Sequence, residues 1–250
     1  MFRNLPSQVY IGAEYYLPLY FQSVKGSSPL GSGLLVIPIT VTEAVTGVLV
    51  GVIIHRTGRY LEIIYVGVLL MTLGNGLYIL FSPKSGIIEI IFIQIVAGIG
   101  AGLLFQAPLI ALQALVSQED TATATATLMF VSNLATALSV VIGGVLFQNS
   151  MDIRVTSLAS PPTNLPSNIT DLLSAGGAAA NVMVVSSIQD QTQRSAVREA
   201  YAWSLRNVWI LYTGISAMAV VTSVFIKKHH LTKDHTETKT GLKSSGQDLA

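Results

Sequence analysis

The stretch Ser32–Ile54 constrains the fold of this chain more than any other segment. It is long enough to cross a bilayer as a helix and carries one charge, Glu43, near its middle. A carboxylate at mid-bilayer costs roughly 2.5–3.5 kcal/mol on insertion scales, so its presence favours a functional role. The basic turn 55–59 follows directly, and such turns face the cytoplasm. The segment therefore predicts a transmembrane helix that ends at the cytoplasmic side.

The rest of the chain shares this apolar character. Of its 250 residues, 51% are hydrophobic and 11% charged, and the mean hydropathy is +0.60, whereas soluble domains are about 25% charged. This composition predicts a multi-pass membrane protein whose main partner is the lipid bilayer. A net charge of +1 and the lack of a basic run argue against nucleic-acid binding. Without cysteine or any HExxH or GxSxG motif, we expect no metal, no cofactor and no enzyme activity.

Charge-free windows of about 20 residues predict an all-α polytopic bundle of about six transmembrane helices within residues 1–226. The first window is short and contains Glu14 and Pro18. Short polar turns separate most of the others, so neighbouring helices should be antiparallel. The predicted spans are Val9–Val24, Ser32–Ile54, Ile63–Phe81, Ile87–Ala107, Thr123–Phe147 and Asn207–Ile226.

Basic residues after the second and sixth spans predict that both termini are cytoplasmic and that residues 148–206 form an external loop. The part of this loop at Val182–Leu205 mixes apolar and charged residues, which predicts an interfacial helix and not a seventh span. Asn168-Ile169-Thr170 is a glycosylation sequon on the same loop. The polar residues 227–250 are predicted to be a disordered cytoplasmic tail.

Glu43 is the candidate for proton coupling. Thr40 and Gly47 share its helical face, and Pro38 frees the backbone carbonyl of Leu34 one turn below. Such a face suits a polar cavity, where burial favours the neutral form of the carboxyl group. The alternative is a purely structural acid, held neutral by a hydrogen bond to a neighbouring helix.

Further polar side chains on the predicted spans are candidates for a substrate cavity. Tyrosines near a helix end more often form an interfacial aromatic belt than a ligand site, and amides in spans, including Asn75 and Gln94, commonly bond across helices. The cavity candidates are Glu14, Tyr15, Tyr16, Tyr20, Gln22, Gln106 and Asn133.

Two pairs of glycines, Gly98 with Gly102 and Gly47 with Gly51, have GxxxG spacing inside apolar helices. Small residues at this spacing let helix backbones approach closely, so tight packing is expected. Sliding of these faces during a conformational change is the functional alternative. A dinucleotide-binding loop does not fit, because Leu103 stands where the third glycine would be needed.

Several segments together resemble the carboxy-terminal half of a major facilitator transporter, of the fourteen-span drug:proton antiporter branch found in fungi. The resemblance covers Tyr15 to Ile226. It is carried by Tyr16-Leu17-Pro18-Leu19-Tyr20-Phe21-Gln22, by Lys25-Gly26, by Ser32-Gly33 with Pro38, by the segment from Gly51 to Arg59, by residues 98–108 and by Phe147-Gln148-Asn149.

The resemblance marks Gly51, His55, Arg56, Gly58 and Arg59 as a copy of the family's cytoplasmic loop signature. His55 replaces an acid of that signature, which puts a charge relay there in doubt. Ser132 and Ala135 stand where the branch would have an arginine and a glycine, which weakens a substrate role for the fifth span.

For function, the resemblance implies half of a transporter built from two six-helix halves around a central cavity. Such a protein exchanges small apolar or amphipathic molecules for protons, and the plasma membrane is the expected location. Half of a cavity implies a need for an N-terminal half or for self-association. The alternative function is a transport-inactive half that only associates with other membrane helices.

Overall fold

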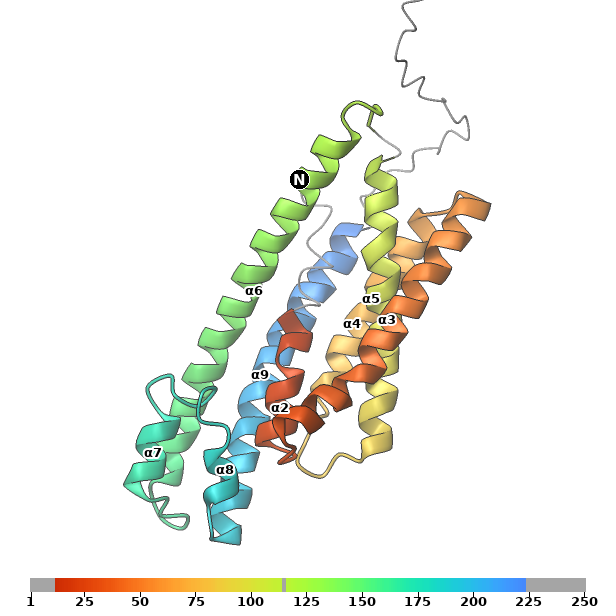
Figure 1. Ribbon diagram of the computed structural model, residues 1–250. Coiled ribbons are helices and arrows are strands. Elements are labelled where there is room, and N and C mark those ends of the chain that lie inside the picture. The colour runs from red at the N-terminus through yellow and green to blue at the C-terminus, as the bar shows by residue number, and fades with distance from the viewer. Residues whose placement is uncertain (1–11, 114–115, 224–250) are drawn as a thin grey trace, which may run out of the picture.

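The computed structural model describes residues 12–113 and 116–223, which contain helices and no strand (Figure 1). The all-α fold predicted from the sequence is confirmed. Five helices are long and apolar enough to cross a membrane: α3 (Pro29–Thr57), α4 (Leu61–Tyr78), α5 (Ile87–Gln113), α6 (Thr121–Leu158) and α9 (Gln191–Ser223). Three short helices complete the described part: α2 (Leu17–Ser23), α7 (Ser167–Leu173) and α8 (Val184–Ser187).

The first predicted span differs from expectation. Residues 12–15 are helical, the chain turns at Tyr16, and the seven-residue α2 follows. Pro18 lies in the first turn of α2, where proline favours the start of a helix and disfavours its continuation from before. The described part of this segment is therefore too short to cross a bilayer, and residues 9–11 lie outside the described residues.

Local capping determines where α3 begins and ends. The Ser28 hydroxyl accepts a hydrogen bond from the Gly31 N–H at 3.1 Å, and Pro29 occupies the first helical position. At the other end Gly58 has a φ of +68°, and its N–H binds the Ile54 carbonyl at 2.8 Å. Glycine adopts this left-handed conformation without steric cost, so it ends the helix just before Arg59.

Helices α6 and α9 are longer than the spans predicted within them. At 1.5 Å per residue they measure about 57 and 50 Å, whereas the bilayer core is about 30 Å thick. Both are therefore longer than the bilayer core, and at one end they run beside α7 and α8 (Figure 1). The prediction of a separate interfacial helix over Val182–Leu205 is wrong, because residues 191–205 are the first turns of α9.

The connector between α6 and α9, residues 159–190, is packed onto the ends of these two helices, and together they form what we call the cap. The Tyr201 hydroxyl donates to the Ala178 carbonyl at 2.8 Å, and the Gln193 amide donates to the Thr163 carbonyl at 3.2 Å. The Arg154 guanidinium lies 4.2 Å from the centre of the Trp203 ring. Apolar side chains of the connector are buried beneath: Leu165, Leu173, Ala178, Val182, Val185 and Ile188.

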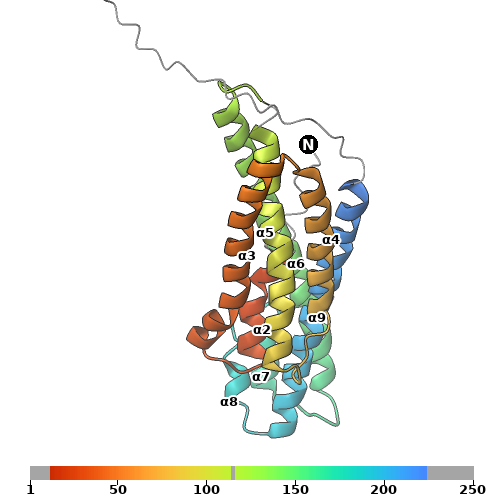
Figure 2. The same ribbon diagram turned by 90° about the vertical axis from the view of Figure 1, so that its right-hand side faces the viewer.

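Helix α5 lies between α3 and α4 (Figure 2). Gly98 and Gly102 face α3: a Cβ atom on them would lie 2.8 Å from the Ile39 carbonyl oxygen and 2.7 Å from the Glu43 carbonyl oxygen. Gly100 faces the opposite way, where a Cβ atom would lie 2.5 Å from the Met71 backbone nitrogen of α4. The predicted close packing at Gly98 and Gly102 is confirmed. By contrast, a Cβ atom on Gly51 would meet nothing within 4 Å.

Candidate functional site

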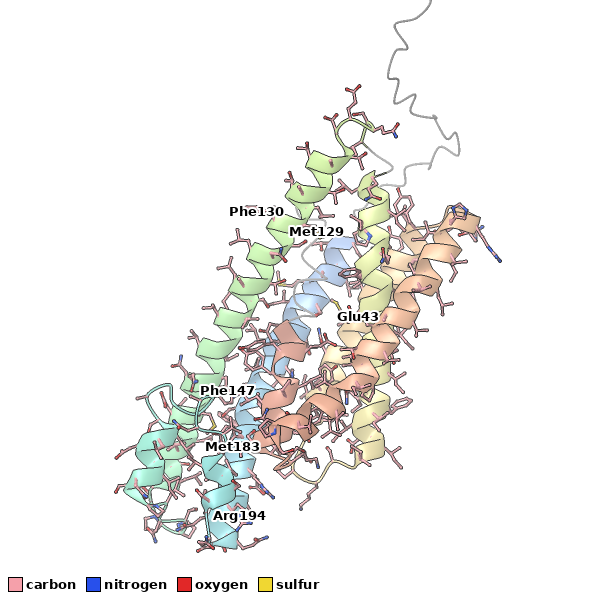
Figure 3. All side chains as sticks on the ribbon, in the orientation of Figure 1. Glu43, Met129, Phe130, Phe147, Met183 and Arg194 are labelled. Carbon is pink, nitrogen blue, oxygen red and sulfur yellow. The ribbon has the colours of Figure 1, made fainter. Side chains whose placement is uncertain are left out.

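Glu43 is the middle residue of α3 and is half-buried (Figure 3). The buried residues of α3, among them Ile39, Gly47, Val50 and Ile54, form one stripe, and Glu43 lies on the same face at helical spacing. This stripe packs against α5. The carboxyl group therefore belongs to the α3–α5 contact and not to the outer apolar surface of α3.

Gln106 lies one turn beyond Gly102 on α5 and is also half-buried. Its Cγ atom is 3.7 Å from the position of a Cβ atom on Gly47. The structure thus places Gln106 against Gly47, one turn along α3 from Glu43. Thr40 lies at the edge of this group: it is exposed, and its hydroxyl donates to the Ile37 carbonyl of its own helix at 3.0 Å.

Large apolar faces are exposed on α3 and α6. On α6 the part before Gly143 is open: none of residues 121–142, all of which the structure describes, is buried. Asn133 lies on this exposed part. Exposed apolar side chains follow both helices: Leu34, Ile37, Val41, Val45 and Val48 on α3, and Phe130, Leu134, Leu138, Val141 and Ile142 on α6.

The predicted tyrosine group divides between core and surface. Tyr16 and Tyr20 are buried, and their hydroxyls donate to the Val140 and Ser82 carbonyls, each at 2.7 Å. Tyr15 is 61% exposed. The Gln22 amide donates to the Ser32 hydroxyl at 2.9 Å and so ties α2 to α3. A substrate contact by any of these side chains stays a prediction.

Tyr20 belongs to an aromatic cluster that joins α2, α4 and α9. Its ring centre is 5.0 Å from that of Phe81 and 5.9 Å from that of Trp209. Tyr78 packs against the same two rings at 5.3 and 5.8 Å. Sequence reasoning did not single out Tyr78, because one more aromatic residue in an apolar span carries no distinct signal.

Glu14 is half-buried and lies close enough to Tyr78 for its charge to act on the phenol. Asn75, one turn away on α4, donates from its amide to the Ser216 hydroxyl of α9 at 2.9 Å, which confirms the expected bond across helices. Gln94 of α5 is fully buried, but neither of its amide atoms has a hydrogen-bond partner within the described residues.

The loop motif after α3 lies at the end of the bundle opposite the cap (Figure 1). His55, Arg56 and Arg59 are exposed, and the backbone N–H of Arg59 donates to the Thr57 hydroxyl at 3.3 Å. Gly58 has a defined structural role, since its left-handed conformation terminates α3. At the cap end, Asn168 is exposed, as a glycan acceptor must be, and its glycosylation stays a prediction.

Among residues 12–113 and 116–223 no group of three histidine or acidic side chains is arranged to hold a metal ion. No family model and no solved structure matches the chain. Curated proteins do match it. An MFS-type transporter, ppz2, of Metarhizium majus is 41% identical over 95% of this chain, and an efflux pump, dotC, of Dothistroma septosporum is 41% identical over the same share. The efflux pump FUS6 of Gibberella fujikuroi is 29% identical over 92%.

The chain belongs to the major facilitator superfamily (MFS). It spans about 40% of the length of each of these three relatives. The five long apolar helices agree with a multi-pass membrane protein of this superfamily that is only part of the length of its relatives. The predicted family resemblance is thereby confirmed. The half-buried Glu43 and Gln106 therefore lie within an MFS helix bundle.

Proposed function

We propose that this chain forms part of an MFS exporter that moves small apolar or amphipathic molecules across the membrane in exchange for protons. Glu43 is the proposed proton-coupling residue. The observation that carries the proposal is a half-buried carboxyl group at the middle of an apolar helix, one turn from the point where Gln106 of the adjacent helix packs against Gly47. A charged group at this depth is unfavourable unless it is neutralised or paired, so its protonation state responds to small changes in its surroundings.

The open faces of α3 and α6 support the pathway part of the proposal. Both faces are apolar, and they belong to helices of a chain about 40% as long as its relatives. An exporter of this superfamily needs a surface that meets both cargo and a second group of helices. The fourteen-span antiporter branch and the plasma membrane are the expected context.

The test is transport in inside-out vesicles, with the chain expressed alone and with the chain replacing the matching region of the Metarhizium transporter. Uptake of a fluorescent amphipathic dye is measured with and without an imposed proton gradient. Glu43→Gln is the coupling variant, and Glu62→Gln, an exposed acid at the first turn of α4, is the matched control. We expect gradient-driven uptake by the chimera to fall at least tenfold with Glu43→Gln and to stay unchanged with Glu62→Gln.

If gradient-driven uptake persists in Glu43→Gln, Glu43 is not the coupling residue. If uptake does not depend on the gradient in any variant, the chimera does not exchange its cargo for protons. The exposed apolar faces also favour the second function, a helix-association protein without transport. In that case the chimera takes up no dye, whereas the chain still co-purifies with itself or with a second set of helices. Transport by the chain alone would show that neither self-association nor an N-terminal half is needed.

A further inference from the structure

A second polar layer lies inside the bundle, away from the open faces, and the proposed transport pathway does not use it. Its members are Asn75 and Tyr78 on α4, Gln94 on α5 and Ser216 on α9. All four are 0% exposed. Four fully buried polar side chains in helices of this apolarity need a physical reason, because each loses its contacts with water.

The helix contacts place these residues at one depth. Gly74 of α4 meets Ala97 of α5, and Gly67 meets Leu104, so the two helices run antiparallel. Tyr78 lies four residues after Gly74, and Gln94 lies three residues before Ala97, so both are about one turn from that contact in the same direction. On the third side, the amide of Asn75 binds Ser216, and the ring of Tyr78 packs 5.8 Å from Trp209.

The hydrogen-bonding capacity of this layer is only partly used within the described residues. The Oδ1 atom of Asn75, the hydroxyl of Tyr78 and both amide atoms of Gln94 are buried and have no partner there. Leaving one such group unpaired costs about 1–3 kcal/mol. Water satisfies both donors and acceptors and commonly fills buried polar sites of this kind, where it forms about three hydrogen bonds.

Glu14 borders the layer. The neighbouring Ala13 carbonyl accepts a hydrogen bond from the Trp209 indole at 3.4 Å, and the Trp209 ring lies 5.8 Å from that of Tyr78, so this segment is held beside the layer. The other titratable groups nearby are the phenols of Tyr16 and Tyr212, whose hydroxyls already donate to carbonyls of α6. The charged and histidine side chains of α3, α4, α5 and α9 are the exposed His55, Arg56, Glu62, Glu89, Glu199 and Arg206, the half-buried Arg194 and Arg198, and Glu43 at the α3–α5 contact.

We propose that this layer binds water and that Glu14 is a proton-binding site served by that water. The carboxylate takes a proton from a hydronium ion of the buried water and becomes a neutral carboxyl group, and the reverse step returns the proton. The unpaired atoms of Tyr78, Gln94 and Asn75 hold the water next to it. This site is separate from Glu43, and it does not depend on whether the chain transports anything.

The first test is infrared difference spectroscopy of the full chain in lipid nanodiscs during a pH titration, following the C=O stretch of protonated carboxyl groups. Glu14→Gln should remove one titrating band. Tyr78→Phe and Gln94→Leu should each shift the pH midpoint of that band by about one unit, because the water around the carboxyl group changes. Gln113→Leu is the control: it removes an exposed amide of the same helix, about five turns away, and should leave the band in place.

The second test addresses the water directly. Hydroxyl radicals generated by X-rays modify buried side chains only where water is bound, so Tyr78 should be labelled in the wild type and protected in Gln94→Leu. Helix content by circular dichroism identifies the variants that fold. If Gln94→Leu does not fold, the pH midpoint of Tyr78→Phe still tests the layer, because that substitution keeps the aromatic ring in the core. A spectrum unchanged by Glu14→Gln would overturn the proton site. An unlabelled Tyr78 in the wild type, or a midpoint indifferent to both layer variants, would overturn the water layer.

Discussion

Residues 121–142 and 143–158 form one continuous helix, α6, yet only the second part contains buried residues. The second part buries Gly143, Phe147, Ser150, Met151 and Val155. The residues of the first part are exposed or half-buried, although this part is at least as apolar (Figure 3). In a membrane, apolar character only makes a helix compatible with lipid, so close packing depends on shape and hydrogen bonds. Here packing begins where two glycines let neighbouring side chains reach the helix backbone.

The junction between the two parts is held by two tyrosines. The hydroxyls of Tyr16 and Tyr212 donate to the Val140 and Ser139 carbonyls at 2.7 and 2.8 Å. They reach the backbone over Gly143, where a Cβ atom would collide with the Tyr212 hydroxyl and lie 2.9 Å from Cε2 of Tyr16. The segment before α2, the middle of α9 and the junction of α6 are therefore joined at one point.

The largest expected effect comes from a pair of matched phenylalanines, one in each part of α6. Phe147 is 1% exposed and Phe130 is 69% exposed. Phe147→Ala should destabilise the fold by about 3 kcal/mol, at the lower end for buried aromatic truncations because lipid already provides an apolar surrounding. Phe130→Ala should change stability by less than about 0.5 kcal/mol. Unfolding in mixed micelles with increasing SDS measures both.

Equal losses from the two phenylalanine variants would show that the first part of α6 is packed after all. Helix content measured before denaturation serves as the control, because a variant that never inserts gives no unfolding transition. If only Phe130→Ala is destabilising, the assignment of packed and open parts must be reversed.

Part of this comparison could be predicted from the sequence. The windows for α3, α4 and α5 match the observed helices closely, since apolar length alone identifies a span. The window for α6 ended too early and the window for α9 began too late, because a charge-free window excludes charges such as Asp152 and Arg198 whereas the helices continue through them. The length of a charge-free window reflects the thickness of the bilayer core, whereas a helix continues for as long as its backbone hydrogen bonds and packing allow.

The candidate site shows the same division. Glu43 and the close-packing glycines Gly98 and Gly102 stand out from the sequence because a charge and regular small residues are rare signals in apolar spans. The nearness of Gln106 to Gly47, and of Glu14 to Tyr78, depends on the register between helices, which no local pattern encodes. The split between buried Tyr16 and Tyr20 and exposed Tyr15 likewise required the neighbouring helices.

A smaller effect is expected at the junction itself. Gly143→Ala should displace the Tyr16 and Tyr212 hydroxyls and cost about 1–3 kcal/mol, as overpacking of a filled site does. Gly144→Ala is the matched control, because its Cβ atom would lie 3.4 Å from the Tyr16 hydroxyl, which needs only a slight adjustment. Thermal unfolding in detergent compares the two. If both variants behave alike, close approach at Gly143 does not decide where α6 begins to pack.

The smallest expected effect tests the cap end, to which the packed part of α6 belongs, through Lys25. Its ammonium group donates to the Pro83 and Ser85 carbonyls and so joins the α2–α3 and α4–α5 turns. Burial lowers the pKa of Lys25 from its usual 10.5, nearby Arg198 adds to this, and Glu89 opposes it. The unfolded chain therefore binds more protons than the folded chain between the lowered pKa and 10.5, so this group makes stability rise with pH across that window.

Lys25→Met should remove this rise, whereas Lys84→Met, which removes an exposed lysine from the same turn region, should keep it. The measurement is the unfolding midpoint of the three proteins on the alkaline side, read as the difference between each variant and the wild type so that the titration of tyrosines cancels. If Lys25→Met leaves the dependence of the unfolding midpoint on pH unchanged, the ammonium group is as well solvated in the folded chain as in the unfolded one. The two turns would then be held by the packing of α2 and α4 alone, and the cap end would be no more firmly closed by polar contacts than the opposite end.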